Sequence, residues 1–315
     1  MRGFNFFNLK SIIIVGPTAV GKTNLSILLA KEISGEIIGL DSRQIFDFMP
    51  IGTGQPSKEE MIGIKHHLIG SHKLTRKISA GKYSKLIFKC IEKIKKKNKI
   101  PIICGGSGLY FRALVKGLFD GSITNYNIRK KLIKRLELEG PKVLLDELKS
   151  VDLNYSKIVH KNNVKRLLRA LEIYYITGKG PSEHFKMQKI KTNDNFFKIY
   201  LKMDIDSLRI KIKNRILSMI KNGWIEEVNQ IASMDYKNPT QAMESIGFND
   251  VNDFLNKKIN LNELIEQINV NTRQYAKKQI KWFDREKFDL VIDVTQLNNS
   301  STAIKKIINN FYNIK

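Results

Sequence analysis

Short apolar runs alternate along the chain with longer stretches in which apolar residues recur every three to four positions. The apolar runs predict buried strands at residues 11–15, 36–40, 100–104, 196–203 and 288–294. Helical spacing is seen at 24–32 and 80–97, and again between the last two predicted strands. Because strands that alternate with helices usually form a mostly parallel sheet covered on both faces, this pattern predicts an α/β fold.

The character of the sequence changes after residue 119. A loop-like segment at 120–125 is followed by a helical and basic stretch, which closes with a polar segment at 177–182. We therefore expect a helical insertion at 120–190 within an α/β core formed by residues 1–119 and 191–315.

A glycine-rich segment lies between the first predicted strand and the first predicted helix. It fits the pattern G-x-x-x-x-G-K-T of a phosphate-binding loop, in which backbone N–H groups surround phosphate oxygens. Lys22 would add a positive charge, and the Thr23 hydroxyl would hold Mg²⁺. The flanking strand and helix favour this interpretation over a turn without a ligand, and they predict a core like that of P-loop NTPases. The predicted phosphate-binding residues are Gly16, Pro17, Thr18, Ala19, Val20, Gly21, Lys22 and Thr23.

Further polar segments follow predicted strands and would face the same edge of the sheet. Asp41 could bind Mg²⁺ or act as a general base, or it could simply cap the next helix. The glycine-rich turn at 105–110 could contact a ligand or serve only as a tight turn. His66 and His67 could be ligands, although a structural role is the commoner one for such a pair.

Composition adds a strong positive charge to this picture. The 315 residues include 55 Lys and Arg but 30 Asp and Glu, which gives a formal net charge of +25. Such an excess would attract a polyanion such as nucleic acid, although a lysine-rich genome composition is an alternative explanation. The two cysteines support neither a disulfide framework nor a zinc site. No apolar run is long enough for a signal peptide or a membrane-spanning helix, so we expect a soluble, cytoplasmic protein without a membrane partner.

Taken in order, several segments resemble the tRNA dimethylallyltransferase family, also called tRNA isopentenyltransferases. The segments that carry the resemblance are the loop at 16–23, Asp-Ser-Arg-Gln at 41–44, His-His-Leu-Ile at 66–69, Gly-Gly-Ser-Gly-Leu-Tyr at 105–110, Lys-Arg-Leu-Leu-Arg-Ala-Leu-Glu at 165–172, Gly-Trp-Ile-Glu-Glu-Val at 223–228 and Thr-Arg-Gln-Tyr-Ala-Lys-Lys-Gln at 272–279. They span nearly the whole chain. The lack of a Cys/His cluster after residue 285 is typical of the bacterial type.

The resemblance implies transfer of a dimethylallyl group from dimethylallyl diphosphate to N6 of the adenine that follows the anticodon in tRNA. By the same resemblance, Asp41 is the general base, Thr18 lies close to the reaction, and the phosphate loop binds the leaving diphosphate with Mg²⁺. Lys211 stands where an arginine near the diphosphate is usual in the family. We expect a monomer.

The resemblance also implies tRNA contacts from both parts of the chain, with the insertion binding the anticodon arm. These residues are Asp41, Ser42, Arg43, Gln44, Ser107, Arg129, Lys165, Arg166, Leu167, Leu168 and Arg169. From spacing alone, the basic residues at 165–169 form either an RNA-binding stripe or a solvated helix face.

Two other functions would use the same loop and sheet. A nucleotide or small-molecule kinase is the main alternative, and a nucleic-acid-binding ATPase is the other. A kinase with a small substrate needs neither the charge of +25 nor a basic insertion, so the sequence favours the transferase.

Overall fold

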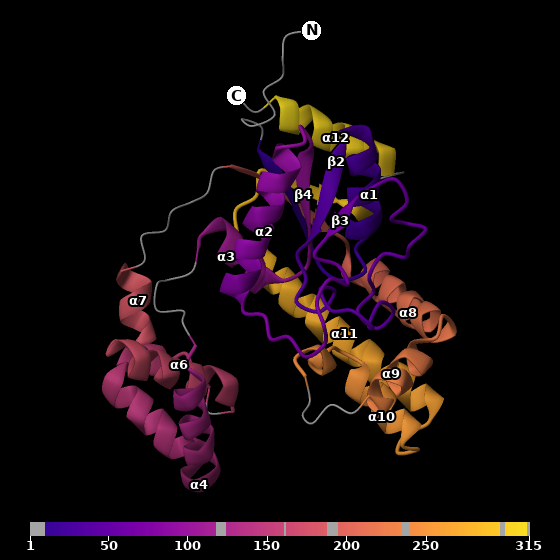
Figure 1. The fold of residues 1–315 in the computed structure, drawn as a ribbon. Coiled ribbons are helices and arrows are strands. Elements are labelled where there is room, and N and C mark those ends of the chain that lie inside the picture. The colour runs from indigo at the N-terminus through magenta and orange to yellow at the C-terminus, as the bar shows by residue number, and fades with distance from the viewer. Residues whose placement is uncertain are drawn as a thin grey trace. The chain divides into compact units, whose positions relative to one another are not determined.

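The computed structural model describes residues 10–117, 124–160, 162–187, 195–234, 240–296 and 300–313. It divides into two compact units (Figure 1). Unit 1 comprises Met1–Val115 and Asn193–Lys315, and unit 2 comprises Lys116–Thr192. The helical insertion predicted from the sequence is therefore present in the fold.

Unit 1 is built on a six-stranded sheet in the order β3-β2-β4-β1-β5-β6, in which all the strand pairs are parallel. Its strands are β1 (Ser11–Val15), β2 (Gly35–Gly39), β3 (His66–His67), β4 (Ile100–Gly105), β5 (Phe196–Lys202) and β6 (Leu290–Asp293). The predicted α/β class with a parallel sheet is confirmed. The sequence pattern missed β3, because two residues are too few to show a period.

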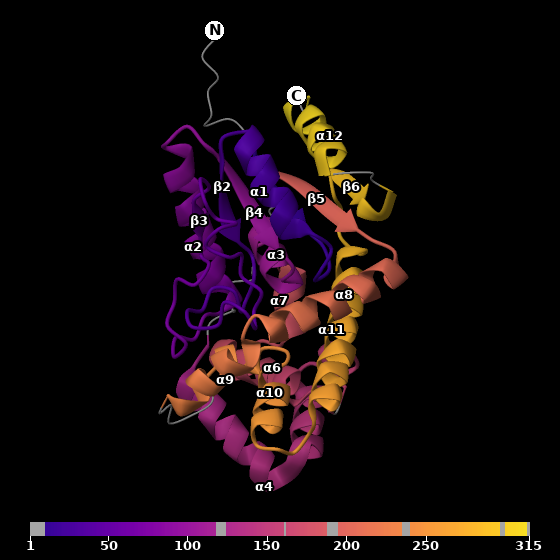
Figure 2. The ribbon, with the colours of Figure 1, turned by 90° about the vertical axis from the view of Figure 1, so that its right-hand side faces the viewer.

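Helices cover both faces of this sheet, which explains why the central strand β1 is apolar and wholly buried. Figure 1 shows α2 and α3 on one side of the sheet and α1 and α12 on the other. The remaining helices, α8 to α11, extend beyond the sheet (Figure 2). The helices of unit 1 are α1 (Lys22–Glu32), α2 (Ala80–Lys95), α3 (Gly108–Val115), α8 (Ile205–Lys221), α9 (Trp224–Ser233), α10 (Phe248–Leu255), α11 (Leu261–Phe283) and α12 (Ser300–Tyr312).

Unit 2 consists of helices around its own small apolar core. They are α4 (Tyr126–Val151), α5 (Leu153–Ser156), α6 (Val164–Thr177) and α7 (Pro181–Met187). A kink in α4 occurs at Gly140, whose φ is 77°, just before Pro141. Leu167 and Leu168 of α6 are buried in this core, with exposed fractions of 0% and 6%. Their side chains face the interior of the unit, and contact of these two residues with tRNA stays a prediction.

Within the described ranges, no helix combines the length and the apolar character needed to cross a membrane.

Candidate active site

Two adjoining cavities lie at the carboxyl ends of the strands of unit 1. The larger has a volume of about 670 Å³ and the smaller about 340 Å³. Segments that follow β1 and β2 line both cavities together with α8 and α11. The residues common to both linings are Thr18, Ala19, Asp41, Thr53, Arg215, Met219 and Tyr275. Ligand sites of open parallel sheets lie at this edge, so the cavities are where the fold class places a binding site.

The glycine-rich loop forms one wall of the larger cavity. Gly16 must be glycine, because a Cβ there would lie 2.6 Å from the Leu201 carbonyl oxygen of β5. Gly21, with φ at 99°, leads into the first turn of α1. Thr18, Ala19, Gly21, Lys22 and Thr23 line the cavity, whereas Gly16, Pro17 and Val20 line neither cavity, and Val20 is buried in the core. The loop thus presents the start of a helix, where backbone N–H groups favour anions, to the larger cavity.

Lys22 is folded back onto its own loop. Its Nζ donates hydrogen bonds to the carbonyl oxygens of Gly16 at 3.0 Å and Pro17 at 2.6 Å. Burial lowers the pKa of Lys22 to about 8, with a further lowering from Arg215 and an opposite effect from Asp41. Lys22 is therefore mostly protonated and positively charged below about pH 8, and mostly neutral above it.

This pKa predicts how anion binding depends on pH. In the free protein, the Kd for inorganic pyrophosphate is expected to rise by up to about tenfold per pH unit above about pH 8, because binding requires the protonated lysine. Lys22→Met should bind more weakly below pH 8 and should approach the wild type above it, which calorimetry can follow. Lys31→Met, an exposed position on the same helix, serves as the control for titration of the ligand itself. A constant ratio of Kd between Lys22→Met and wild type across this range would contradict the prediction.

Asp41 combines a structural role with a position at the junction of the two cavities. Its Oδ1 accepts hydrogen bonds from the backbone N–H groups of Arg43 at 2.8 Å and Gln44 at 3.3 Å. The carboxylate also interacts electrostatically with Lys22 and Arg215. Within the described range 10–117, no helix follows Asp41 before α2, so the helix-cap alternative is wrong: Asp41 stabilises a turn, and it lines both cavities.

Arg215 is the cavity arginine that sequence reasoning missed. Its Nη1 lies 3.4 Å from Thr18 Oγ1, and it lines both cavities. The guanidinium lies so close to Gly54 that a Cβ there would come within 1.7 Å of Nη2. Lys211, one helical turn earlier in α8, is exposed and lines neither cavity. Of these two basic residues only Arg215 contributes its side chain to the cavities, and the family position of Lys211 stays a prediction.

The loop at residues 49–56 is fixed by two side chains from outside it. Gln44 Nε2 donates to the carbonyl oxygens of Thr53 at 3.3 Å and Gly54 at 2.7 Å. Buried Glu227 of α9 accepts the N–H groups of Ile51 and Gly52, both at 2.7 Å, and burial raises the pKa of this carboxyl. These contacts hold Thr53 in the walls of both cavities.

Gln279 of α11 joins the phosphate loop to the second glycine-rich turn. Its Oε1 accepts the N–H of Thr18 at 2.8 Å, and its Nε2 donates to the Gly106 carbonyl oxygen at 2.8 Å. A Cβ at Gly105 would lie 2.1 Å from the Leu40 carbonyl oxygen, so that turn needs glycine for close packing. Gly105 and Gly106 also line the larger cavity, and contact of this turn with a ligand stays a prediction.

Of the other residues predicted to contact tRNA from unit 1, two lie at the smaller cavity and one does not. Ser42 and Arg43 line it, and the Arg43 guanidinium donates to the Gln241 carbonyl oxygen and pairs with Glu244 at 3.5 Å. Ser107 is half-buried and lines neither cavity.

The lining of the smaller cavity combines the polar segment that contains Asp41 with a largely apolar group of side chains. This apolar wall would accommodate a hydrocarbon group beside a phosphate site. It is formed by Ile212, Ile216, Met219, Trp224, Ile246 and Ile268.

The two adjacent histidines have a structural role. They form β3, and His67 Nε2 lies 2.7 Å from Oε2 of buried Glu36. Burial opposes the ionisation of Glu36, but hydrogen bonds from His67, Lys99 and Lys97 lower its pKa to about 2. Neither histidine lines either cavity. Across the described residues, no group of three His, Cys, Asp or Glu side chains is placed to hold a metal ion.

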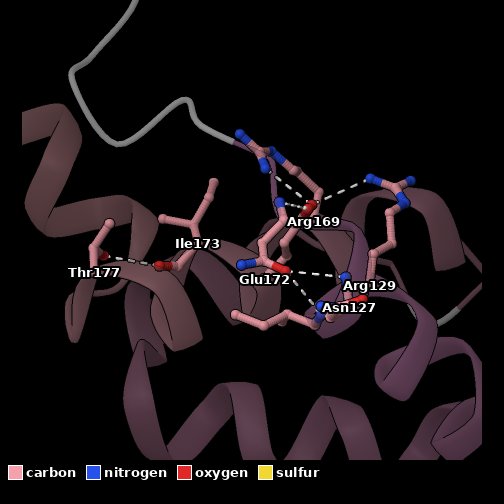
Figure 3. A network of polar contacts seen from close by, with 8 residues as sticks. Asn127, Arg129, Arg169, Glu172, Ile173 and Thr177 are labelled. Atoms are coloured by element: carbon pink, nitrogen blue, oxygen red, sulfur yellow. Dashed lines mark hydrogen bonds and ion pairs between the residues drawn. The ribbon is translucent and has the colours of Figure 1, made fainter. Parts of the chain in front are cut away.

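In unit 2, the predicted RNA-binding residues divide into two groups. Lys165 and Arg166 are exposed at the start of α6. Arg129 of α4 and Arg169 of α6 both reach Oε2 of Glu172, with Nη1 atoms at 3.2 Å and 2.9 Å (Figure 3).

Comparisons with known proteins agree across nearly the whole chain. The IPP transferase family model matches residues 44–286. The tRNA dimethylallyltransferase of Acetivibrio thermocellus is 36% identical over 298 residues, which cover 94% of this chain and 95% of that protein. The crystal structure of the tRNA delta(2)-isopentenylpyrophosphate transferase of Staphylococcus epidermidis has 32% identity and a TM-score of 0.70, with coverage of 97% and 100%. A eukaryotic dimethylallyltransferase, captured in crystallographic snapshots acting on tRNA, has 30% identity and a TM-score of 0.83, with coverage of 96% and 79%.

The matched regions of these proteins include the elements that form the site. The matched range of the family model contains Arg215 and Gln279, and the relatives are similar over lengths that take in both units. The sequence, the fold and the paired cavities therefore lead to one assignment: the chain belongs to the tRNA dimethylallyltransferase (IPP transferase) family.

Proposed function

We propose that this protein transfers the dimethylallyl group of dimethylallyl diphosphate to N6 of the adenine on the 3′ side of the anticodon (A37) in tRNA. The observation that carries the proposal is the junction of the two cavities. A phosphate loop with Lys22 lies on one side, an apolar wall on the other, and Asp41 and Arg215 lie where the cavities meet. One substrate with a diphosphate and a hydrocarbon end matches that arrangement.

The charges of the site fit a reaction in which diphosphate leaves. As the allylic C–O bond breaks, negative charge grows on the diphosphate, and Lys22, Arg215 and the loop N–H groups stabilise it. The C5 fragment, held against the apolar wall, becomes electron-poor and is attacked by N6 of the adenine. The Asp41 carboxylate takes the N6 proton, and Thr18, bonded to Arg215 and Gln279, keeps these groups in register.

Mg²⁺ fits the donors of the larger cavity. Thr23 contributes a hydroxyl, an oxygen ligand of the kind this ion prefers. Since no cluster of three acidic, cysteine or histidine residues is found in the described part of the chain, the diphosphate itself would supply much of the coordination. When bound, the ion would neutralise charge on the departing diphosphate.

An assay separates this function from that of a kinase. The protein is incubated with labelled dimethylallyl diphosphate, Mg²⁺ and total tRNA, and the expected result is label in RNA at A37. Labelled ATP with small-molecule acceptors serves as the parallel reaction. Phosphoryl transfer from ATP without prenylation of tRNA would contradict the proposal and identify the protein as a kinase.

Unit 2 is proposed to bind the anticodon arm through the exposed cations at the start of α6. Lys165→Ala with Arg166→Ala is expected to raise the Kd for tRNA several-fold and to reduce the slope of log K against log salt by about 1 to 2, because about two phosphate contacts are lost. The slope is measured by anisotropy titrations at several salt concentrations. Lys130→Ala with Lys131→Ala, exposed in α4, removes the same charge elsewhere in unit 2. An unchanged slope in the α6 variant would indicate that Lys165 and Arg166 belong to a solvated helix face that does not contact RNA.

A further inference from the structure

A fully buried carboxylate lies between two arginines in unit 2. Glu172 has an exposed fraction of 0%. Its Oε2 accepts Nη1 of Arg129 at 3.2 Å and Nη1 of Arg169 at 2.9 Å, while its Oε1 accepts the backbone N–H of Asn125 at 3.0 Å (Figure 3). Burying a carboxylate is costly unless it is paired and hydrogen-bonded, and here both oxygens are engaged.

The two arginines, in contrast, remain partly at the surface. Their side chains are 39% and 27% exposed, and they come from different helices, Arg129 from α4 and Arg169 from α6. Since both Nη1 atoms bond to the same oxygen, the two guanidinium groups lie side by side. Two like charges at that separation repel each other unless a negative charge lies between them.

We propose that Glu172 is a positioning residue for RNA, which holds Arg129 and Arg169 together so that they contact neighbouring phosphates of the bound tRNA as a pair. This inference rests on the proposed function. A planar guanidinium held in one orientation by a carboxylate loses less conformational entropy when it binds a phosphate. Without Glu172, the two arginines would separate and would have to be brought together at each binding event.

Positioning and simple electrostatics predict opposite effects when Glu172 loses its charge. Removing a negative charge makes the protein more positive, which by itself strengthens RNA binding. Loss of the paired arrangement weakens it. The sign of the change in Kd therefore distinguishes the two.

The test uses the full chain with Glu172→Gln, which keeps the size of the side chain. The Kd for tRNA is expected to rise by about tenfold, while kcat at saturating tRNA and the KM for dimethylallyl diphosphate stay unchanged. Glu183→Gln is the matched control, because Glu183 is also in unit 2 and pairs with Lys179 at 2.9 Å but is half exposed. That variant should bind tRNA as well as the wild type or slightly better.

Two outcomes overturn the inference. The first is an unchanged or lower Kd for tRNA in Glu172→Gln. The second is an equally large effect of Glu172→Gln in an Arg129→Ala, Arg169→Ala background, where no pair remains to be positioned.

If Glu172→Gln lowers the folded fraction in thermal unfolding, Arg169→Lys provides the second variant. It keeps the charge beside Glu172 but loses the planar fork, so the Kd for tRNA should still rise several-fold, and an unchanged Kd counts against the inference. Wild-type protein that fails to prenylate tRNA refutes the proposed function instead, whereas normal transfer with unaltered binding in Glu172→Gln refutes only the positioning role.

Discussion

Replacing Asp41 with asparagine is expected to lower kcat for dimethylallyl transfer by about 10²- to 10⁴-fold, with tRNA binding near that of the wild type. The amide cannot take the N6 proton. Its Oδ1 can still accept the N–H groups of Arg43 and Gln44, so the turn after β2 should survive. The KM for dimethylallyl diphosphate should not rise, because the lost charge is negative and lies near Lys22 and Arg215.

A matched control exists in the N-cap of α8. Asp204 Oδ1 accepts the Ser207 N–H at 2.8 Å, so Asp204→Asn makes the same chemical change in a comparable turn away from both cavities. It should retain normal turnover. Single-turnover measurements with saturating tRNA report the chemical step directly, and turnover of Asp41→Asn within a few-fold of wild type would remove this residue from proton transfer.

Replacing Arg215 with methionine is expected to lower kcat/KM for dimethylallyl diphosphate by about 10²- to 10³-fold, through both weaker binding and slower transfer. The guanidinium lies at the junction of the cavities, 3.4 Å from Thr18 Oγ1, where we propose that charge develops on the diphosphate. Methionine keeps the side-chain stem but removes the Cζ and Nη2 atoms that lie closest to Gly54. Arg215→Lys should recover part of the loss, since it restores the charge without the planar fork.

Lys211 offers the control for Arg215 on the same helix. It is exposed and lines neither cavity, so Lys211→Met should leave kcat/KM within about twofold of wild type, as surface changes usually do. Steady-state kinetics with varied dimethylallyl diphosphate compares the two variants. If Lys211→Met lowered kcat/KM more than Arg215→Met, residue 211 would be the cation near the diphosphate, as the resemblance suggested.

The parts of this molecule that were predictable from sequence are those whose signal is local. The strand β1, the glycine-rich loop and the start of α1 follow one another within about twenty residues, and each has its own pattern. Asp41 was identifiable because the end of a parallel strand faces the ligand edge.

What could not be predicted depends on which positions along a helix meet the site or the core. In α8, Lys211 and Arg215 are one turn apart and both basic, so charge alone could not choose between them; only packing against Gly54 shows which enters the site. For the run at 165–169, the resemblance assigned RNA contacts to a whole segment, which stays a prediction. The burial of Leu167 and Leu168 shows that only its polar positions reach the surface. Glu172 gave no signal, since a glutamate in a basic helix resembles any surface residue until its burial is known.

The bridge from Gln279 to Thr18 links positions 261 residues apart. On a ribosome, the phosphate loop is therefore made almost at the beginning of synthesis and gains this partner only near its end. A nascent chain that has reached β5 already contains the complete nucleotide-loop signature, yet it lacks α11 and the amide that ties the loop to the second glycine turn. A premature stop between β5 and α11 would thus yield a chain that contains the phosphate-loop motif but lacks Gln279 and the cavity wall that α11 provides.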